Sequence, residues 1–130
     1  MILVDSSVWI DFFNGTENAE TDKLNEMLGL EEIVIGDLML VEVLQGFRND
    51  TDYKTAKNVL TSLTVHELLG KELAIKSANN FRKLRKKGIT IRKTADVIIA
   101  TYCIENKMPL LFTDKDFLPF VANLRLKSVC

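Results

Sequence analysis

The sequence predicts an α/β domain with a mostly parallel central sheet and helices on both faces of that sheet. Its 130 residues are enough to bury a continuous core. Short apolar runs alternate with segments of helical periodicity, and no Gly/Ser-rich linker, repeat or low-complexity tract divides the chain. Strands joined by helices usually form a parallel sheet covered on both sides. We therefore expect residues 1–130 to form a single domain.

The elements follow from apolar patterning and capping residues. A short apolar run ends at Asp5, and Ser6 or Ser7 can cap a helix that continues to Phe13. Asp37 is placed to cap a later helix. The expected strands are Ile2–Val4, Ile33–Ile35, Val65–Leu68, Pro109–Phe112 and a half-exposed last strand, Leu124–Val129. The remaining expected helices are Ala19–Leu28, Leu38–Phe47, Thr55–Leu63, Lys71–Lys87 and Ala95–Asn106, with a turn of helix at Phe117–Val121.

Composition excludes several classes of protein. No apolar run approaches the roughly 20 residues that span a bilayer. The apolar start of the chain has no basic leader and contains Asp5 and Asp11, so we expect no signal peptide and a cytoplasmic protein. Cys103, Cys130 and the single histidine, His66, fit neither a zinc site nor a Ser-His-Asp or Cys-His nucleophile. Chemistry in this chain must therefore depend on carboxylates.

Acidic residues stand where parallel strands should end and where apolar helices should carry none. In open parallel sheets, functional groups gather just past the carboxyl ends of the strands, and Asp5, Asp114 and Asp116 follow two of them. Glu42 and Asp96 interrupt apolar helical segments. Burying isolated carboxylates is unfavourable, so several that converge require a cation. Hard oxygen ligands of this kind suit Mg²⁺ or Mn²⁺.

Each acid also has a simpler structural explanation. Asp5 can cap the first helix, Asp96 can favour a helix dipole, and Glu42 can lie on a narrow solvent stripe. Asp114 and Asp116 can terminate a strand in a turn. Only their joint occurrence in one α/β domain favours a metal site. Ser6 and Ser7 can hydrogen-bond a carboxylate, a water or a phosphate at the same edge, or serve only as caps.

The charge of the chain is unevenly distributed. The segment from Gly70 to Lys93 contains nine Lys and Arg residues against Glu72 alone, a net charge of +8, so the remainder must carry −9 to give the total of −1. A basic face of this density can bind phosphates with salt-dependent, sequence-tolerant affinity. We expect Arg85, Lys86 and Lys87 to contact RNA. The alternative is a solvated helix face that balances the acidic remainder.

The chain resembles the PIN domain family and, within it, the VapC-type toxins of toxin-antitoxin pairs. The matching segments are LVDSSVWIDFF, LMLVEVLQGFR, TADVIIATYCIENKMPLLFTDKDF and LRLKSV. The resemblance implies Mg²⁺-dependent endoribonuclease activity, a homodimer and neutralisation by a cognate antitoxin. It assigns metal-site roles to Asp5 and Asp96, and then to Glu42 and Asp114. Many relatives have a residue between the threonine and the aspartate, whereas Thr113 directly precedes Asp114 here. Asp114 or Asp116 can complete the site, and we favour Asp114 because it is nearer the strand end.

These observations predict a mechanism for the nuclease and leave two other functions to compare with it. Asp5, Asp96 and Asp114 are expected to position Mg²⁺ or Mn²⁺, as one ion or as a pair, while Glu42 orients or deprotonates the attacking water. A receiver-like phospho-acceptor would have an acidic pair at the first strand end, which this chain lacks. A noncatalytic RNA-binding or partner-binding PIN-like domain remains the alternative.

The apolar first helix predicts a surface for the antitoxin. Trp9 and Phe47 lie near helix boundaries, and large aromatic side chains are good interface anchors. We expect both to contact the antitoxin. Ile10 and Leu44 are expected to be ordinary core residues.

Overall fold

A four-stranded parallel sheet runs through the computed structural model of this chain, which describes residues 1–130. The strands are β1 (Ile2–Val4), β2 (Ile33–Gly36), β3 (Thr64–His66) and β4 (Leu110–Leu111). The helices are α1 (Ser6–Phe13), α2 (Ala19–Met27), α3 (Asp37–Leu44), α4 (Asp50–Thr61), α5 (Lys71–Lys86), α6 (Thr94–Glu105) and α7 (Leu118–Leu124). A 3₁₀ turn, η1 (Lys115–Phe117), precedes α7.

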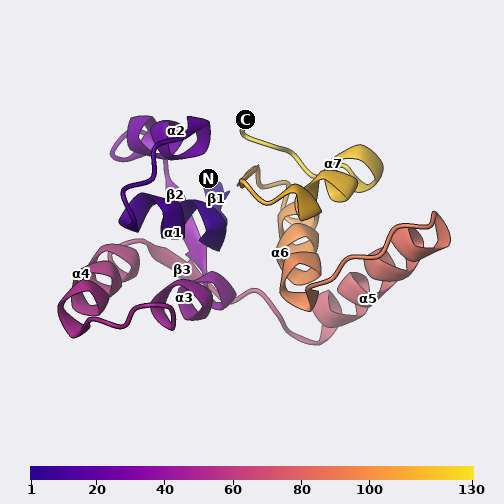
Figure 1. Cartoon of the computed structure of the whole chain (residues 1–130). Helices are drawn as coiled ribbons and strands as arrows, with labels where there is room; N and C mark the ends of the chain where they lie inside the picture. The colour runs from indigo at the N-terminus through magenta and orange to yellow at the C-terminus, as the bar shows by residue number, and fades with distance from the viewer.

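The spatial order of the strands is β3-β2-β1-β4, and every pairing is parallel. Leu3 of β1 is in register with Val34 on one side and with Leu110 on the other. In Figure 1, α1 to α4 form one group of helices and α5 to α7 form a second group on the other side. The predicted α/β class, with a parallel sheet flanked by helices, is confirmed. None of the helices is both long enough and apolar enough to cross a membrane.

The two inner strands and α6 form the centre of the core. All four residues of β2 are buried, as are Leu3 and Val4 of β1, because strands covered by helices on both faces have no exposed side. Most of α6 is buried as well, from Asp96 to Thr101. A carboxylate in the first turn of this helix is therefore carried into the interior at the carboxyl edge of the sheet.

Of the caps considered for the first helix, the structure has Asp5 and not Ser6 or Ser7, so the helix begins at Ser6. The Asp5 carboxylate accepts the backbone N–H of Ser7 at 3.1 Å. The chain leaves β1 and enters the helix with no intervening loop, so the residue that ends the strand also caps the helix. Asp5 is thus fixed at the strand end by its own helix.

The second expected cap was wrong by one residue. Gly36 is the N-cap of α3, and Asp37 is its first residue. The Asp37 carboxylate accepts the backbone N–H of Leu38 at 2.9 Å and that of Leu68 at 3.1 Å, so it ties α3 to the segment after β3. At Gly36 an added Cβ would lie 2.5 to 2.9 Å from side-chain atoms of Leu68, which explains why glycine stands at the end of β2.

The end of the chain does not form the expected strand. Residues through Leu124 belong to α7, and Arg125 ends that helix in the left-handed region with φ of 66°. Only Ser128 forms a parallel bridge, to Leu110. The alternation that predicted a strand at residues 124–129 comes mainly from Leu126, which packs into the core. The helix expected to reach Phe47 also ends early, because α3 ends at Leu44 and leaves Phe47 outside the helix.

Candidate metal centre

Asp5 directly follows the inner strand β1, at the carboxyl edge of the sheet. Its side chain is 3% exposed, and its Oδ2 accepts hydrogen bonds from the backbone N–H of Ser7 and, at 2.6 Å, from the Ser7 hydroxyl. Its Oδ1 is buried and has no hydrogen-bond partner. Burial raises the pKa of Asp5, against the effect of its Ser7 hydrogen bonds. One carboxylate oxygen is therefore satisfied by the fold and the other is left for a ligand.

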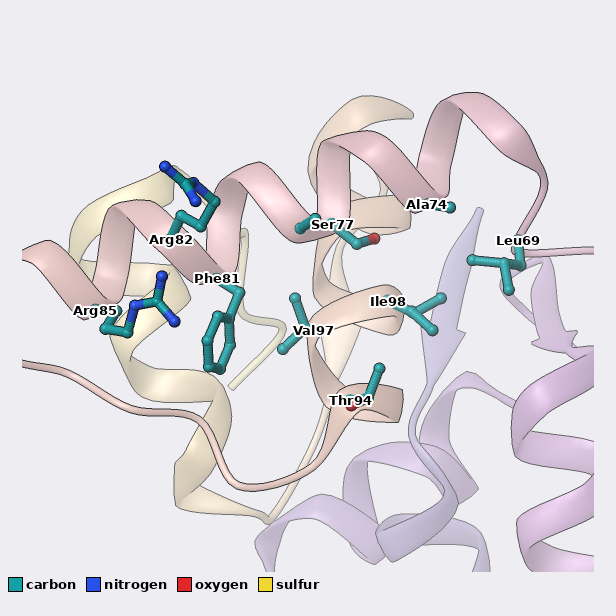
Figure 2. Close-up of a pocket in the computed structure, with 10 residues that line it drawn as sticks. Leu69, Ala74, Ser77, Phe81, Arg82, Arg85, Thr94, Val97 and Ile98 are labelled. Atoms are coloured by element: carbon teal, nitrogen blue, oxygen red, sulfur yellow. The ribbon is translucent and has the colours of Figure 1, made fainter.

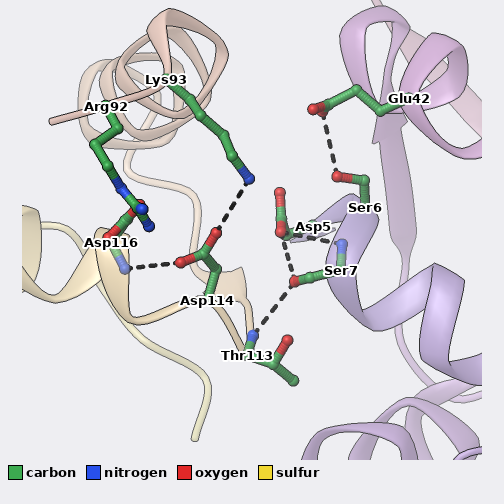
Figure 3. Close-up of polar contacts among 9 residues, drawn as sticks. All are labelled: Asp5, Ser6, Ser7, Glu42, Arg92, Lys93, Thr113, Asp114 and Asp116. Atoms are coloured by element: carbon green, nitrogen blue, oxygen red, sulfur yellow. Dashed lines mark hydrogen bonds and ion pairs between the residues drawn. The ribbon is translucent and has the colours of Figure 1, made fainter.

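Ser7 links the segments that follow β1 and β4, which carry Asp5 and Asp114. Its hydroxyl oxygen, besides donating to Asp5, lies 3.5 Å from the backbone nitrogen of Thr113, whose N–H donates to it. Figure 3 shows this link between the start of α1 and the segment after β4. Ser7 thereby holds Asp5 in register with the chain that leads into Asp114.

Asp96 enters from the opposite side, as the third residue of α6. It is 4% exposed, and its Oδ2 is buried without a partner. Burial, together with the negative charges of Asp5 and Asp114, raises the pKa of Asp96 to about 7 from an ordinary value of 3.8. The Asp96 carboxylate is therefore close enough to both of these acids for their negative charges to disfavour its ionisation.

Asp114 and Asp116 follow β4 at the same edge. Asp114 is the N-cap of η1, and its Oδ1 accepts the backbone N–H of Asp116 at 2.9 Å. Asp96, Asp114 and Asp116 each offer a carboxylate oxygen, and the three oxygens lie within 4.8 Å of one another. Asp114 and Asp116 are thus both near enough to Asp96 to share an ion with it.

Glu42 reaches the site from α3. Its Oε1 accepts a hydrogen bond from the Ser6 hydroxyl at 3.2 Å, and Figure 3 shows it on the far side of Asp5 from Asp114. Partial burial and the charge of Asp5 raise the pKa of Glu42. A carboxylate with a raised pKa that keeps access to water has the properties of a general base.

The donor set fits a hard divalent cation. Five acids from four segments converge at one edge, and burial together with the charges of neighbouring acids makes three of them harder to ionise. Two buried oxygens, Asp5 Oδ1 and Asp96 Oδ2, have no donor. An ion such as Mg²⁺ or Mn²⁺ would neutralise the repulsion and satisfy both.

Two basic side chains also lie at this edge. From the sequence they were recognised only as part of the basic segment. Lys93 Nζ lies 3.7 Å from Asp114 Oδ2, and Arg92 Nη2 lies 3.4 Å from Asp116 Oδ2. The signal in the sequence was a basic pair directly before the helix that carries Asp96. No local pattern identifies which acids such residues meet.

The expected RNA-binding residues lie along α5. Arg85, Lys86 and Lys87 are exposed, and the guanidinium of Arg85 lies over the Phe81 ring, 5.5 Å from its centroid. Figure 2 shows Arg82 and Arg85 at one end of a groove of about 580 Å³ between α5 and α6. Thr94, the first residue of α6, lines the same groove. The groove therefore leads from the basic helix to the start of the helix that holds Asp96.

The two expected antitoxin contacts have different surroundings. Trp9 is fully buried and packs on Phe12 and Phe13, so its assignment to an open groove was wrong. Phe47 is partly buried against Phe13, at 5.8 Å between ring centroids, and keeps an accessible face. Ile10, expected in the core, is instead 40% exposed. Five of the eight residues of α1 are apolar, so its pattern did not indicate which of them turn inward.

Comparison with known proteins identifies the class to which this fold and site belong. Residues 2–120 match the family model of the PIN domain, and the chain belongs to the PIN domain family. It is 28% identical to Ribonuclease VapC11 from Mycobacterium tuberculosis, over 98% of each chain.

Solved structures show the same fold. VapBC2 from Rickettsia felis, bound to a promoter DNA fragment, superposes with a TM-score of 0.77 at 16% identity, over 98% of this chain and 97% of that one. DNA-bound VapBC from Salmonella typhimurium gives a TM-score of 0.73 at 15% identity, over 98% and 97%.

Proposed function

We propose that this chain is a metal-dependent endoribonuclease, a single domain of residues 1–130 whose active centre is the acidic cluster at the carboxyl edge of the sheet. The observation that carries the proposal is the convergence of Asp96, Asp114 and Asp116 oxygens within 4.8 Å, beside the unpartnered buried oxygens of Asp5 and Asp96. Membership of the PIN domain family and the ribonuclease name of the relative support it.

Asp5, Asp96 and Asp114 are the residues proposed to hold Mg²⁺ or Mn²⁺, with Asp116 as a further ligand from the same turn. When bound, the cation supplies positive charge beside the scissile phosphate and makes water a stronger nucleophile at neutral pH. The hydrogen bonds from Ser7 orient Asp5, so that its free oxygen stays directed into the site. This preorganisation removes the need to move a buried carboxylate during binding.

Glu42 is proposed to orient or deprotonate the attacking water. A raised pKa makes the Glu42 carboxylate a better proton acceptor, and the Ser6 hydroxyl donates a hydrogen bond to one of its oxygens. Water attacks the phosphorus in line and the 3'-oxygen leaves, so the products carry a 5'-phosphate and a 3'-hydroxyl. The RNA 2'-hydroxyl takes no part in this step.

RNA is proposed to approach over the basic helix. Arg85, Lys86 and Lys87 are exposed at the end of α5, and Arg85 borders the groove that leads to Thr94. Contacts from these side chains to phosphates bring affinity without base recognition. The sequence preference of cleavage must then come from other contacts.

We further propose that the chain is a cytoplasmic toxin that acts as a homodimer and is held inactive by a cognate antitoxin. The structural neighbours named VapBC support a paired toxin and antitoxin. The exposed Ile10 and the partly buried Phe47 are the apolar residues near the first helix that an antitoxin segment can contact. A basic antitoxin side chain would complement the acidic cluster.

The direct test is RNA cleavage by the purified protein with EDTA, Mg²⁺ or Mn²⁺, followed by analysis of the new RNA ends. We expect cleavage only with a divalent ion, 5'-phosphate products, and no cleavage by Asp5→Asn or Asp96→Asn. Asp52→Asn is a matched control, because Asp52 is also the third residue of its helix but is exposed. Cleavage by both site variants, or activity in EDTA, would contradict the proposal.

A further inference from the structure

Lys93 and Arg92 pair with two of the carboxylates that can share a metal ion. The Lys93 to Asp114 distance is 3.7 Å and the Arg92 to Asp116 distance is 3.4 Å. The basic side chains are 59% and 80% exposed, whereas the two carboxylates are 27% and 26% exposed. In Figure 3 the Lys93 amine extends from the start of α6 into the space between Asp114 and Asp5. Two exposed basic side chains thus reach two less exposed carboxylates.

Local helix chemistry does not explain a lysine at position 93. It is the N-cap of α6, where Ser, Thr, Asp or Asn is favoured, and its side chain makes no capping hydrogen bond. A positive charge is also unfavourable at the N-terminus of a helix, because the helix dipole is positive there. A lysine is disfavoured at this position for both reasons, so we attribute its presence to the acidic residues that it faces.

A divalent ion that binds Asp114 and Asp116 must compete with these cations. Both pairs are open to water, so solvent screens them and their displacement is easy. Once displaced, both side chains keep their charge and remain at the mouth of the site. Thr94, the next residue, borders the groove that carries Arg82 and Arg85, from which RNA is proposed to approach.

We propose that Lys93, assisted by Arg92, is an internal cation that neutralises the empty metal centre and moves to the RNA phosphate when a divalent ion replaces it. The inference rests on the proposed nuclease function and adds a positioning role for residues outside the acidic set. It makes two predictions of opposite sign: loss of the Lys93 charge strengthens metal binding and weakens RNA binding.

The test is Mn²⁺ titration of Lys93→Met without RNA, followed through free Mn²⁺ by electron paramagnetic resonance. Removal of one exposed ion pair should tighten Mn²⁺ binding by about two- to fivefold. Binding of a short mixed-sequence RNA is then measured with Mn²⁺ present, in an Asp5→Asn background that retains enough ligands to bind Mn²⁺ at higher concentration. There Lys93→Met should weaken RNA binding at least about threefold, as expected for the loss of one phosphate contact.

Two further variants separate a specific role from a general effect of charge. Lys93→Arg keeps the cation and should restore both affinities to near the parental values. Lys115→Met removes an exposed lysine adjacent to the same carboxylates that forms no ion pair, and should change either affinity less than Lys93→Met does.

The outcomes distinguish this inference from the function on which it rests. Absence of both Mn²⁺ binding and RNA cleavage in the parent protein would refute the nuclease proposal and the inference with it. Normal Mn²⁺ binding by the parent, with equal or weaker binding by Lys93→Met, would overturn the inference alone. Tighter Mn²⁺ binding with unchanged RNA binding would overturn the transfer to phosphate.

Discussion

Replacing Asp96 with asparagine should stabilise the metal-free protein while it abolishes cleavage. The pKa of Asp96 is raised to about 7 by burial and by the charges of Asp5 and Asp114, so its ionised form is unfavourable in the folded state. Asparagine keeps the shape of the side chain and removes the charge. Under the proposed function the same charge binds the metal, so stability and activity are expected to change in opposite directions.

The magnitude follows from the pKa difference. One pH unit corresponds to about 1.4 kcal/mol, so the interval from 3.8 to about 7 corresponds to about 4 kcal/mol. Water at the partly exposed Asp114 screens the charge of that residue, which reduces the expected gain to about 2 kcal/mol. The ionisation penalty is absent below the unfolded-state pKa, grows as the pH rises, and is constant above about 7. The gain should therefore be near zero around pH 4 and complete around pH 8.

The assay is urea unfolding of the parent protein, Asp96→Asn and Asp52→Asn in EDTA across this pH range. Asp52→Asn should lower the free energy of unfolding by about 0.3–1 kcal/mol, because that exposed residue only complements a helix dipole. Saturating Mg²⁺ should stabilise the parent more than Asp96→Asn. If Asp96→Asn is no more stable than the parent at high pH, and shows the same pH dependence, the acids do not crowd one another as described.

Three further predictions concern the surface and the core. Replacing the three basic residues at the end of α5 with glutamine should reduce the salt dependence of RNA binding by about two units of slope, measured by fluorescence anisotropy; an unchanged slope would place RNA elsewhere. Phe47→Ala should weaken antitoxin binding with little loss of stability, whereas Trp9→Ala should lower the free energy of unfolding by about 3–5 kcal/mol. If Phe47→Ala lowers the free energy of unfolding as much as it weakens antitoxin binding, Phe47 belongs to the core. Gly36→Ala should destabilise the protein by about 1–3 kcal/mol, because the added Cβ would collide with the Leu68 side chain. Leu68→Ala should relieve part of that loss in the double variant. The same loss in both backgrounds would mean that the Leu68 side chain moves away.

The sheet and its acidic edge could be predicted because they depend on patterns local in sequence. Parallel strands place their carboxyl ends together, so Asp5 and Asp114 had to share an edge once the strands were recognised. Glu42 and Asp96 were noticeable as charges within apolar helices, and burial of Asp96 follows from burial of α6. The approach of all four residues to one another follows from the topology rather than from any one motif.

Other features depend on tertiary contacts that a single sequence does not contain. The orientation of α1 was ambiguous because most of its residues are apolar, so Trp9 and Ile10 were assigned to the wrong sides. The last strand failed because one buried leucine, Leu126, imitates an alternating pattern. The pairing of Lys93 with Asp114 joins positions that are near only in the folded chain.

The most direct test of the account is anomalous diffraction from crystals of the protein grown with Mn²⁺, because it locates the ion without reference to activity. We expect a Mn²⁺ peak at the carboxyl edge of the sheet, within coordination distance of Asp5, Asp96 and Asp114, with Asp116 as the alternative or additional ligand. We also expect the Lys93 amine to have moved away from Asp114. A Mn²⁺ peak elsewhere, or none at this edge in protein that cleaves RNA, would contradict the claim that these acids form the metal centre.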